Sequence, residues 1–154
     1  MRNVWIDTGG TFTDCVAVDD TGAWRREKVL SSGALRGSVE AVLSTRRLRI
    51  TCAWRHAPAD FIKRFEFRLL GRDHPRVVVE AYDPKDSTVT LDVGILSGDA
   101  VGAAFEVHSP EEAPILAARL ATGTLSGFYL PPMSMRLATT RGTNALLERG
   151  GART

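Results

Sequence analysis

The chain of 154 residues contains few of the side chains from which metal centres and disulfide frameworks are built. Its two cysteines, Cys15 and Cys52, lie far apart within strand-like stretches, and neither belongs to a CxxC pair. The three histidines occur singly, at no spacing typical of zinc ligands. We therefore expect reduced core thiols and no metal cluster built by the protein alone, whereas a metal held mainly by a nucleotide remains open.

Long apolar runs and a strong excess of one charge are also missing. No hydrophobic stretch approaches the length that spans a bilayer, and the N-terminal MRNVWIDTGG lacks the features of a secretory signal. The formal net charge is only +2, and the basic residues Arg46, Arg47 and Arg49 alternate in part with apolar ones, as on a solvated strand edge. These observations predict a cytoplasmic protein without a nucleic-acid or membrane partner.

Most of the secondary-structure patterns in the sequence are those of β-strands. Residues 2–30 read as three strands, RNVWID, TFTDCVAV and AWRREKVL, joined by a Gly-Gly turn and by the hairpin signal DDTG. Apolar residues occur on both faces of TFTDCVAV, which predicts a central strand buried on both sides. Residues 37–108 hold six further short runs, SVEAVL, LRITCAW, FEFRLL, RVVVEAY, TVTLDV and AAFEVH. This rhythm predicts an inserted module resembling a small β-barrel.

The remaining segments favour helices and one more strand. SPEEAPILAARLATG predicts a helix with Ser109 as N-cap, Pro110 at the first position and Gly123 just past its end. MRLATT then reads as a short buried strand, and RGTNALLERGG as a helix beginning at Gly142 or Thr143. We expect an α/β (α+β) protein in which residues 1–36 and 109–154 form one subdomain around the 37–108 insertion.

The stretch DTGGTFTD at residues 7–14 is the strongest candidate for chemistry. A Gly-Gly pair between strands also suits a plain hairpin turn, and this alternative remains open. A plain hairpin, however, does not require the side chains of Asp7, Thr11, Thr13 and Asp14. A phosphate-binding turn uses glycine for close backbone approach, hydroxyls and N–H groups for the oxygens, and a carboxylate near the metal. The pattern therefore favours a turn that binds a polyanion.

The segments IDTGGTFTDCVAVD and ATTRGTNALLERGGART together resemble the N-terminal region of the ATP-dependent hydantoinase and 5-oxoprolinase family, which includes acetone carboxylase subunits. The likeness covers residues 2–30 and 109–154. It implies a ribonuclease H-like subdomain of the actin-like ATPase fold, with the adenosine pocket in a later part of a longer enzyme. ATP and Mg²⁺ are the implied cofactors, and this chain alone is expected to be inactive.

The resemblance also implies roles for individual residues. Asp7 would be the metal ligand. The implied catalytic residues are Asp7, Thr11 and Asp14. The implied nucleotide-binding residues are Thr8, Gly9, Gly10, Thr11 and Thr13 from the first motif, and Thr140, Gly142, Thr143 and Asn144 from the second. For the second motif, simple capping of a helix remains the alternative.

The implied reaction opens a cyclic amide at the expense of ATP, whose phosphoryl group turns the amide oxygen into a leaving group. The substrate, whether 5-oxoproline, a hydantoin or an acetone-type compound, stays open. The expected partners are this small molecule and the rest of the enzyme or a second hydantoinase-type subunit, in a homo- or hetero-oligomer. Two rival functions are a sugar or acyl phosphotransferase of the same superfamily and a module that binds a partner through residues 37–108.

Overall fold

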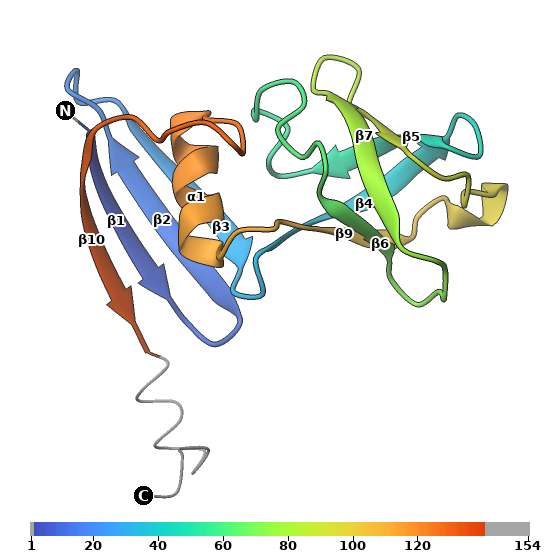
Figure 1. Ribbon diagram of the computed structural model, residues 1–154, viewed down its shortest axis with the longest axis horizontal. Coiled ribbons are helices and arrows are strands. Elements are labelled where there is room, and N and C mark those ends of the chain that lie inside the picture. The colour runs from blue at the N-terminus through green and yellow to red at the C-terminus, as the bar shows by residue number, and fades with distance from the viewer. Residues whose placement is uncertain (1, 141–154) are drawn as a thin grey trace, which may run out of the picture.

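The computed structural model describes residues 2–140, and in this part of the chain ten strands form a continuous hydrogen-bonded sheet accompanied by one α-helix (Figure 1). The elements are β1 (Arg2–Thr8), β2 (Phe12–Val18), β3 (Trp24–Leu30), β4 (Ala34–Val42), β5 (Arg47–Cys52), β6 (Glu66–Leu69), β7 (Val77–Asp83), β8 (Thr88–Leu91), the short 3₁₀ helix η1 (Gly98–Ala100), β9 (Ala104–His108), α1 (Ala113–Thr122) and β10 (Met133–Thr139). This mixture agrees with the expected α+β class. None of the helices in residues 2–140 is long and apolar enough to cross a membrane.

The first part of the fold is the expected meander, to which a distant strand is added. β1 pairs antiparallel with β2, and β2 with β3, as the two turn signals predict. β10 pairs with β1 in parallel, so that Arg2 lies opposite Met133 and Thr8 opposite Thr139. The predicted pairing of MRLATT with the meander is therefore confirmed, and the carboxyl ends of β1 and β10 meet at one edge.

α1 covers one face of this part of the sheet, where it packs on β1, β2 and β3 (Figure 1). Period-two alternation sends Val4 and Ile6 of β1 and Cys15 of β2 into the core below α1. The other face stays partly exposed, and Phe12 there is 43% exposed. The predicted central position of β2 is confirmed by its pairing with β1 and β3. The prediction that β2 is buried on both sides is wrong, because the described residues cover only one of its faces.

β10 also differs from its prediction. The strand forms at the edge of the described sheet, and its side chains from Ser134 to Thr139 are exposed rather than buried. The apolar letters of MRLATT suggested a core strand, but α1 lies over β1, β2 and β3 instead.

The six runs predicted between residues 37 and 108 all form strands, and these close into a ring. The order is β4-β5-β8-β7-β6-β9, and β9 pairs back with β4. Inside this barrel the rings of Phe67 and Phe105 stack with centroids 5.2 Å apart. Gly37 of β4 permits this packing, because a Cβ there would lie 2.6 Å from the Phe105 ring. The ring begins with Ala34, which pairs with His108.

α1 begins three residues later than the capping signal predicts. Its first residue is Ala113 and its N-cap is Glu112, so Pro114 rather than Pro110 occupies the first turn. The Ser109 hydroxyl instead accepts a hydrogen bond from the backbone N–H of Glu111. The predicted end is confirmed, since Gly123 adopts a left-handed conformation with φ of 68°.

Candidate functional site

The β1–β2 turn is held from outside by Ser31, which follows β3. Residues 9–11 form the turn, and the N–H of Gly9 donates to the carbonyl of Phe12 over 2.9 Å. The Ser31 hydroxyl donates to the Gly9 carbonyl over 2.8 Å, and the Ser31 N–H donates to the Thr11 carbonyl over 2.9 Å. The Ser31 Oγ also lies 3.1 Å from the Thr13 Oγ1. The turn is thus fixed at both of its ends.

Glycine at position 9 reflects close packing rather than an unusual backbone conformation. Neither Gly9 nor Gly10 is among the residues with positive φ. A Cβ on Gly9 would lie 3.1 Å from the carbonyl oxygen of Phe12, which is tighter than an ordinary contact. Gly10 and Thr11 are exposed at the tip of the turn.

The two predicted carboxylates lie on the sheet face opposite α1. Asp7 of β1 is paired directly with Asp14 of β2, so the two side chains share that face. Asp14 makes ion pairs with Arg26 at 3.1 Å and Lys28 at 3.7 Å, both from β3. Asp7 is exposed, and no ion pair within residues 2–140 involves it. Asp7 is therefore the carboxylate that is available to a ligand.

A row of threonines crosses the face covered by α1. Thr139 of β10, Thr8 of β1 and Thr13 of β2 are successive cross-strand neighbours at the turn end of the sheet. Thr8 is 4% exposed and Thr13 is fully buried. The Thr13 hydroxyl is paired with Ser31, whereas the Thr8 Oγ1 has no hydrogen-bond partner in the part of the chain that the structure describes. Because side chains alternate between the two faces of a strand, Asp7 lies on one face of the sheet and Thr8 on the other.

The threonine row borders a pocket of about 500 Å³ between the sheet and the start of α1. We call it the threonine pocket, and it is lined by Thr8, Ser31, Ser32, Glu112, Ala113, Pro114, Leu137 and Thr139. No sequence pattern pointed to Ser31, Ser32 or Glu112 as site residues, because they come from the connections before β4 and before α1. A serine pair in a short turn reads as an ordinary loop.

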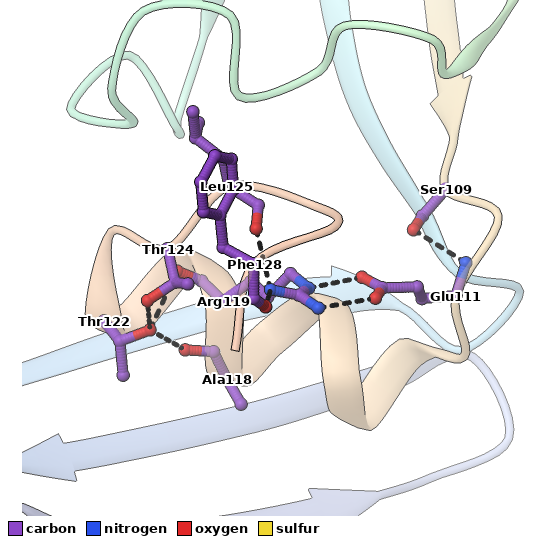
Figure 2. Close-up of polar contacts among 8 residues, drawn as sticks. All are labelled: Ser109, Glu111, Ala118, Arg119, Thr122, Thr124, Leu125 and Phe128. Atoms are coloured by element: carbon purple, nitrogen blue, oxygen red, sulfur yellow. Dashed lines mark hydrogen bonds and ion pairs between the residues drawn. The ribbon is translucent and has the colours of Figure 1, made fainter. Parts of the chain in front are cut away.

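Arg119 of α1 holds both the segment that precedes the helix and the segment that follows it (Figure 2). Its guanidinium donates to both carboxylate oxygens of Glu111, over 2.5 and 2.7 Å. It also donates to the carbonyls of Leu125 and Phe128, over 2.8 and 2.9 Å. Arg119 is 7% exposed, so these bonds are shielded from water. The pairing holds Glu111, and with it the neighbouring Glu112 at the threonine pocket.

The second motif reaches the site through Thr140. The N–H of Thr140 donates to the carbonyl of Thr8 over 3.1 Å, which sets it beside the start of the β1–β2 turn. Gly142, Thr143 and Asn144, with the helix predicted there, lie outside the described residues. Within residues 2–140, no three or more His, Cys, Asp or Glu side chains gather as a metal site.

A buried acid and base pair lies apart from this region. Glu27 of β3 is 5% exposed, and its carboxylate lies 2.9 Å from the Nε2 of His56, in the connection that follows β5. Burial raises the pKa of Glu27, and the charges of His56 and Arg25 partly oppose that rise. Sequence reasoning missed this pair, because nothing local links a residue of β3 to one in the barrel.

Comparison with known protein families finds a match over the first third of the chain. Residues 3–55 match the hydantoinase/oxoprolinase N-terminal region, which confirms the resemblance found in the first motif. The match continues through β4 and β5, beyond the limit at residue 30 that we expected. It does not include the second motif. No curated protein and no solved structure matches this chain.

Proposed function

Because residues 3–55 carry the hydantoinase/oxoprolinase N-terminal region, we propose that this chain supplies the phosphate-binding turn of an ATP-dependent hydrolase of cyclic amides. The observation that carries the proposal is the turn at residues 9–11, which Ser31 holds by hydrogen bonds, with the exposed carboxylate of Asp7 beside it. Because these hydrogen bonds fix the turn before any ligand binds, the turn loses little conformational freedom on binding.

The turn has the donors that phosphate oxygens require. The Gly9 N–H is used within the turn, but no hydrogen bond among the described residues uses the N–H of Gly10 or Thr11. Both residues are exposed, and Thr11 also carries a hydroxyl. Successive free N–H groups in a turn form an anion-binding concavity. Residues 10 and 11 would therefore hold the phosphoryl group that is transferred.

Asp7 fits a magnesium ion that is held mainly by phosphates. Mg²⁺ in nucleotide sites takes one or two carboxylates and completes its shell with phosphate oxygens and water. Asp7 offers one exposed carboxylate close to the turn, whereas Asp14 is engaged by Arg26 and Lys28. When bound there, the ion would neutralise charge on the phosphate oxygens. The arrangement does not require a metal cluster built by the protein.

The strand arrangement supports a relationship to the actin-like ATPases. The order β3-β2-β1-β10, with β10 parallel to β1 and α1 on one face, is compatible with a ribonuclease H-like subdomain. In that arrangement the turn and the carboxyl end of β10 share one edge, and Thr140 lies beside Thr8 at that edge. The remaining nucleotide contacts would come from chain outside the described residues.

Product analysis of the complete protein that contains this chain tests the proposal. The protein is incubated with ATP, Mg²⁺ and either hydantoin or 5-oxoproline, and both the ring-opened product and ADP are measured. We expect the two in equal amounts, and none of the ring-opened product without ATP. A ring that stays closed and carries a phosphate would instead identify a phosphotransferase. Asp86→Asn, an exposed change on the barrel, is the control for general damage.

A further inference from the structure

The Thr8 hydroxyl is a buried polar group without a partner. It lies between Thr139 and Thr13 in the threonine row, 4% exposed, and its Oγ1 makes no hydrogen bond to any of residues 2–140. A buried hydroxyl without a partner is destabilising, and such groups in native proteins are uncommon. Because Thr8 lines the threonine pocket, a ligand in that pocket would supply the missing partner.

The pocket lies next to the proposed phosphate-binding turn. Thr8 immediately precedes Gly9, and Ser31 both lines the pocket and donates to the Gly9 carbonyl. Its volume of about 500 Å³ is within the range of small-molecule sites. A molecule bound in the pocket would therefore lie beside a phosphoryl group held by residues 10 and 11.

The charges around the pocket disfavour a second anion. Glu112 is the only charged residue among the described residues that line it, and no ion pair within residues 2–140 involves Glu112. The adjacent Glu111, by contrast, is neutralised by Arg119. The first turn of α1 has a positive partial charge, which Glu112 at the N-cap partly offsets although its side chain makes no capping hydrogen bond. A ligand carboxylate would meet Glu112 without a compensating cation among the described lining residues.

We propose that the threonine pocket binds the ring of the cyclic amide and selects an uncharged ring with several N–H groups over a ring that carries a carboxylate. The inference rests on the proposed function and adds the class of substrate. The Thr8 hydroxyl donates to a ring carbonyl or accepts from a ring N–H, and Glu112 accepts from a ring N–H. Ala113, Pro114 and Leu137 supply the apolar wall. A cyclic ureide such as hydantoin meets these requirements, whereas 5-oxoproline brings a carboxylate.

The test compares two substrates on the complete enzyme. ATP-dependent ring opening of hydantoin and of 5-oxoproline is measured for the wild type, Glu112→Gln, Thr8→Val and the control Glu40→Gln, which alters an exposed barrel residue. We expect the wild type to have the higher kcat/KM for hydantoin. Glu112→Gln should shift the ratio of the two kcat/KM values roughly tenfold towards 5-oxoproline. Thr8→Val should raise the KM for hydantoin roughly tenfold, which is more than it changes the KM for ATP.

A wild type that prefers 5-oxoproline, or a ratio unchanged in Glu112→Gln, would overturn the inference while leaving the proposed function intact. Binding of hydantoin to the wild type and to Thr8→Val, measured calorimetrically, tests the pocket independently of the proposed function. Binding that Thr8→Val weakens, in a protein that opens no ring, would support the pocket and contradict the proposed function. Absence of both binding and ring opening would reject both.

Discussion

The Ser31 hydroxyl donates a hydrogen bond to the carbonyl of Gly9 over 2.8 Å, although 22 residues separate them. The antiparallel return of β3 beside β2 brings Ser31 to the turn end of the sheet, where it also meets Thr11 and Thr13. The shape of the candidate phosphate-binding turn therefore depends on a residue outside the motif.

Ser31→Ala should loosen this turn. The change leaves the Gly9 carbonyl and the buried Thr13 hydroxyl without their partner, which corresponds to about 1–3 kcal/mol of unfolding free energy. Urea unfolding measures that loss, with Ser134→Ala on the exposed edge strand as the matched control. In the complete protein we also expect a higher KM for ATP. Equal stability and equal KM in the two variants would contradict the role of Ser31.

Asp7→Asn should abolish most of the ATP-dependent activity of the complete enzyme without altering its fold. The amide keeps the shape of the side chain but loses the charge that Mg²⁺ requires, and we expect turnover to fall by about a hundredfold or more. Because Asp7 is exposed, the unfolding midpoint should stay the same. Steady-state turnover at saturating ATP measures the effect. Activity within a few-fold of the wild type would exclude Asp7 from the site.

The two thiols should be unreactive in the folded protein. Burial, with a smaller effect from the Glu27 charge, raises the pKa of Cys15 to about 11, and burial raises the pKa of Cys52 to about 11 as well. The reactive thiolate is therefore rare at neutral pH. A thiol reagent such as Ellman's should react slowly with the native chain and label both cysteines after denaturation. Rapid labelling of Cys15 in native buffer would show that the core below α1 opens.

The strands were predictable because their alternation is local, and each expected run of the meander and the barrel forms. The start of α1 was not, because Ser109 and Glu111 are held by distant partners, Gly33 and Arg119. The motif at residues 7–14 was recognisable from its own composition. Ser31 and Glu112 were not, since only the return of β3 and the placement of α1 bring them to that motif. Local patterns thus define the turn, and tertiary contacts define the pocket.

The buried pair of Glu27 and His56 predicts a dependence of stability on pH. Burial raises the pKa of Glu27 above its ordinary value, and the charged groups near its carboxylate are Arg25 and His56. A carboxyl group whose pKa is higher in the folded state favours folding below its ordinary pKa, and this contribution is lost as pH rises through the raised pKa. The wild type should therefore lose the Glu27 contribution as pH rises above the ordinary pKa of a glutamate.

Glu27→Gln removes this titration but keeps an oxygen that can accept a hydrogen bond from His56. We expect the variant to become more stable relative to the wild type as pH rises from about 4 to 7, because only the wild type must bury a carboxylate there. Urea unfolding at several pH values measures the difference, with Glu40→Gln on the barrel surface as the control. A difference that stays constant or shrinks with rising pH would mean that the His56 and Arg25 charges outweigh the burial of Glu27.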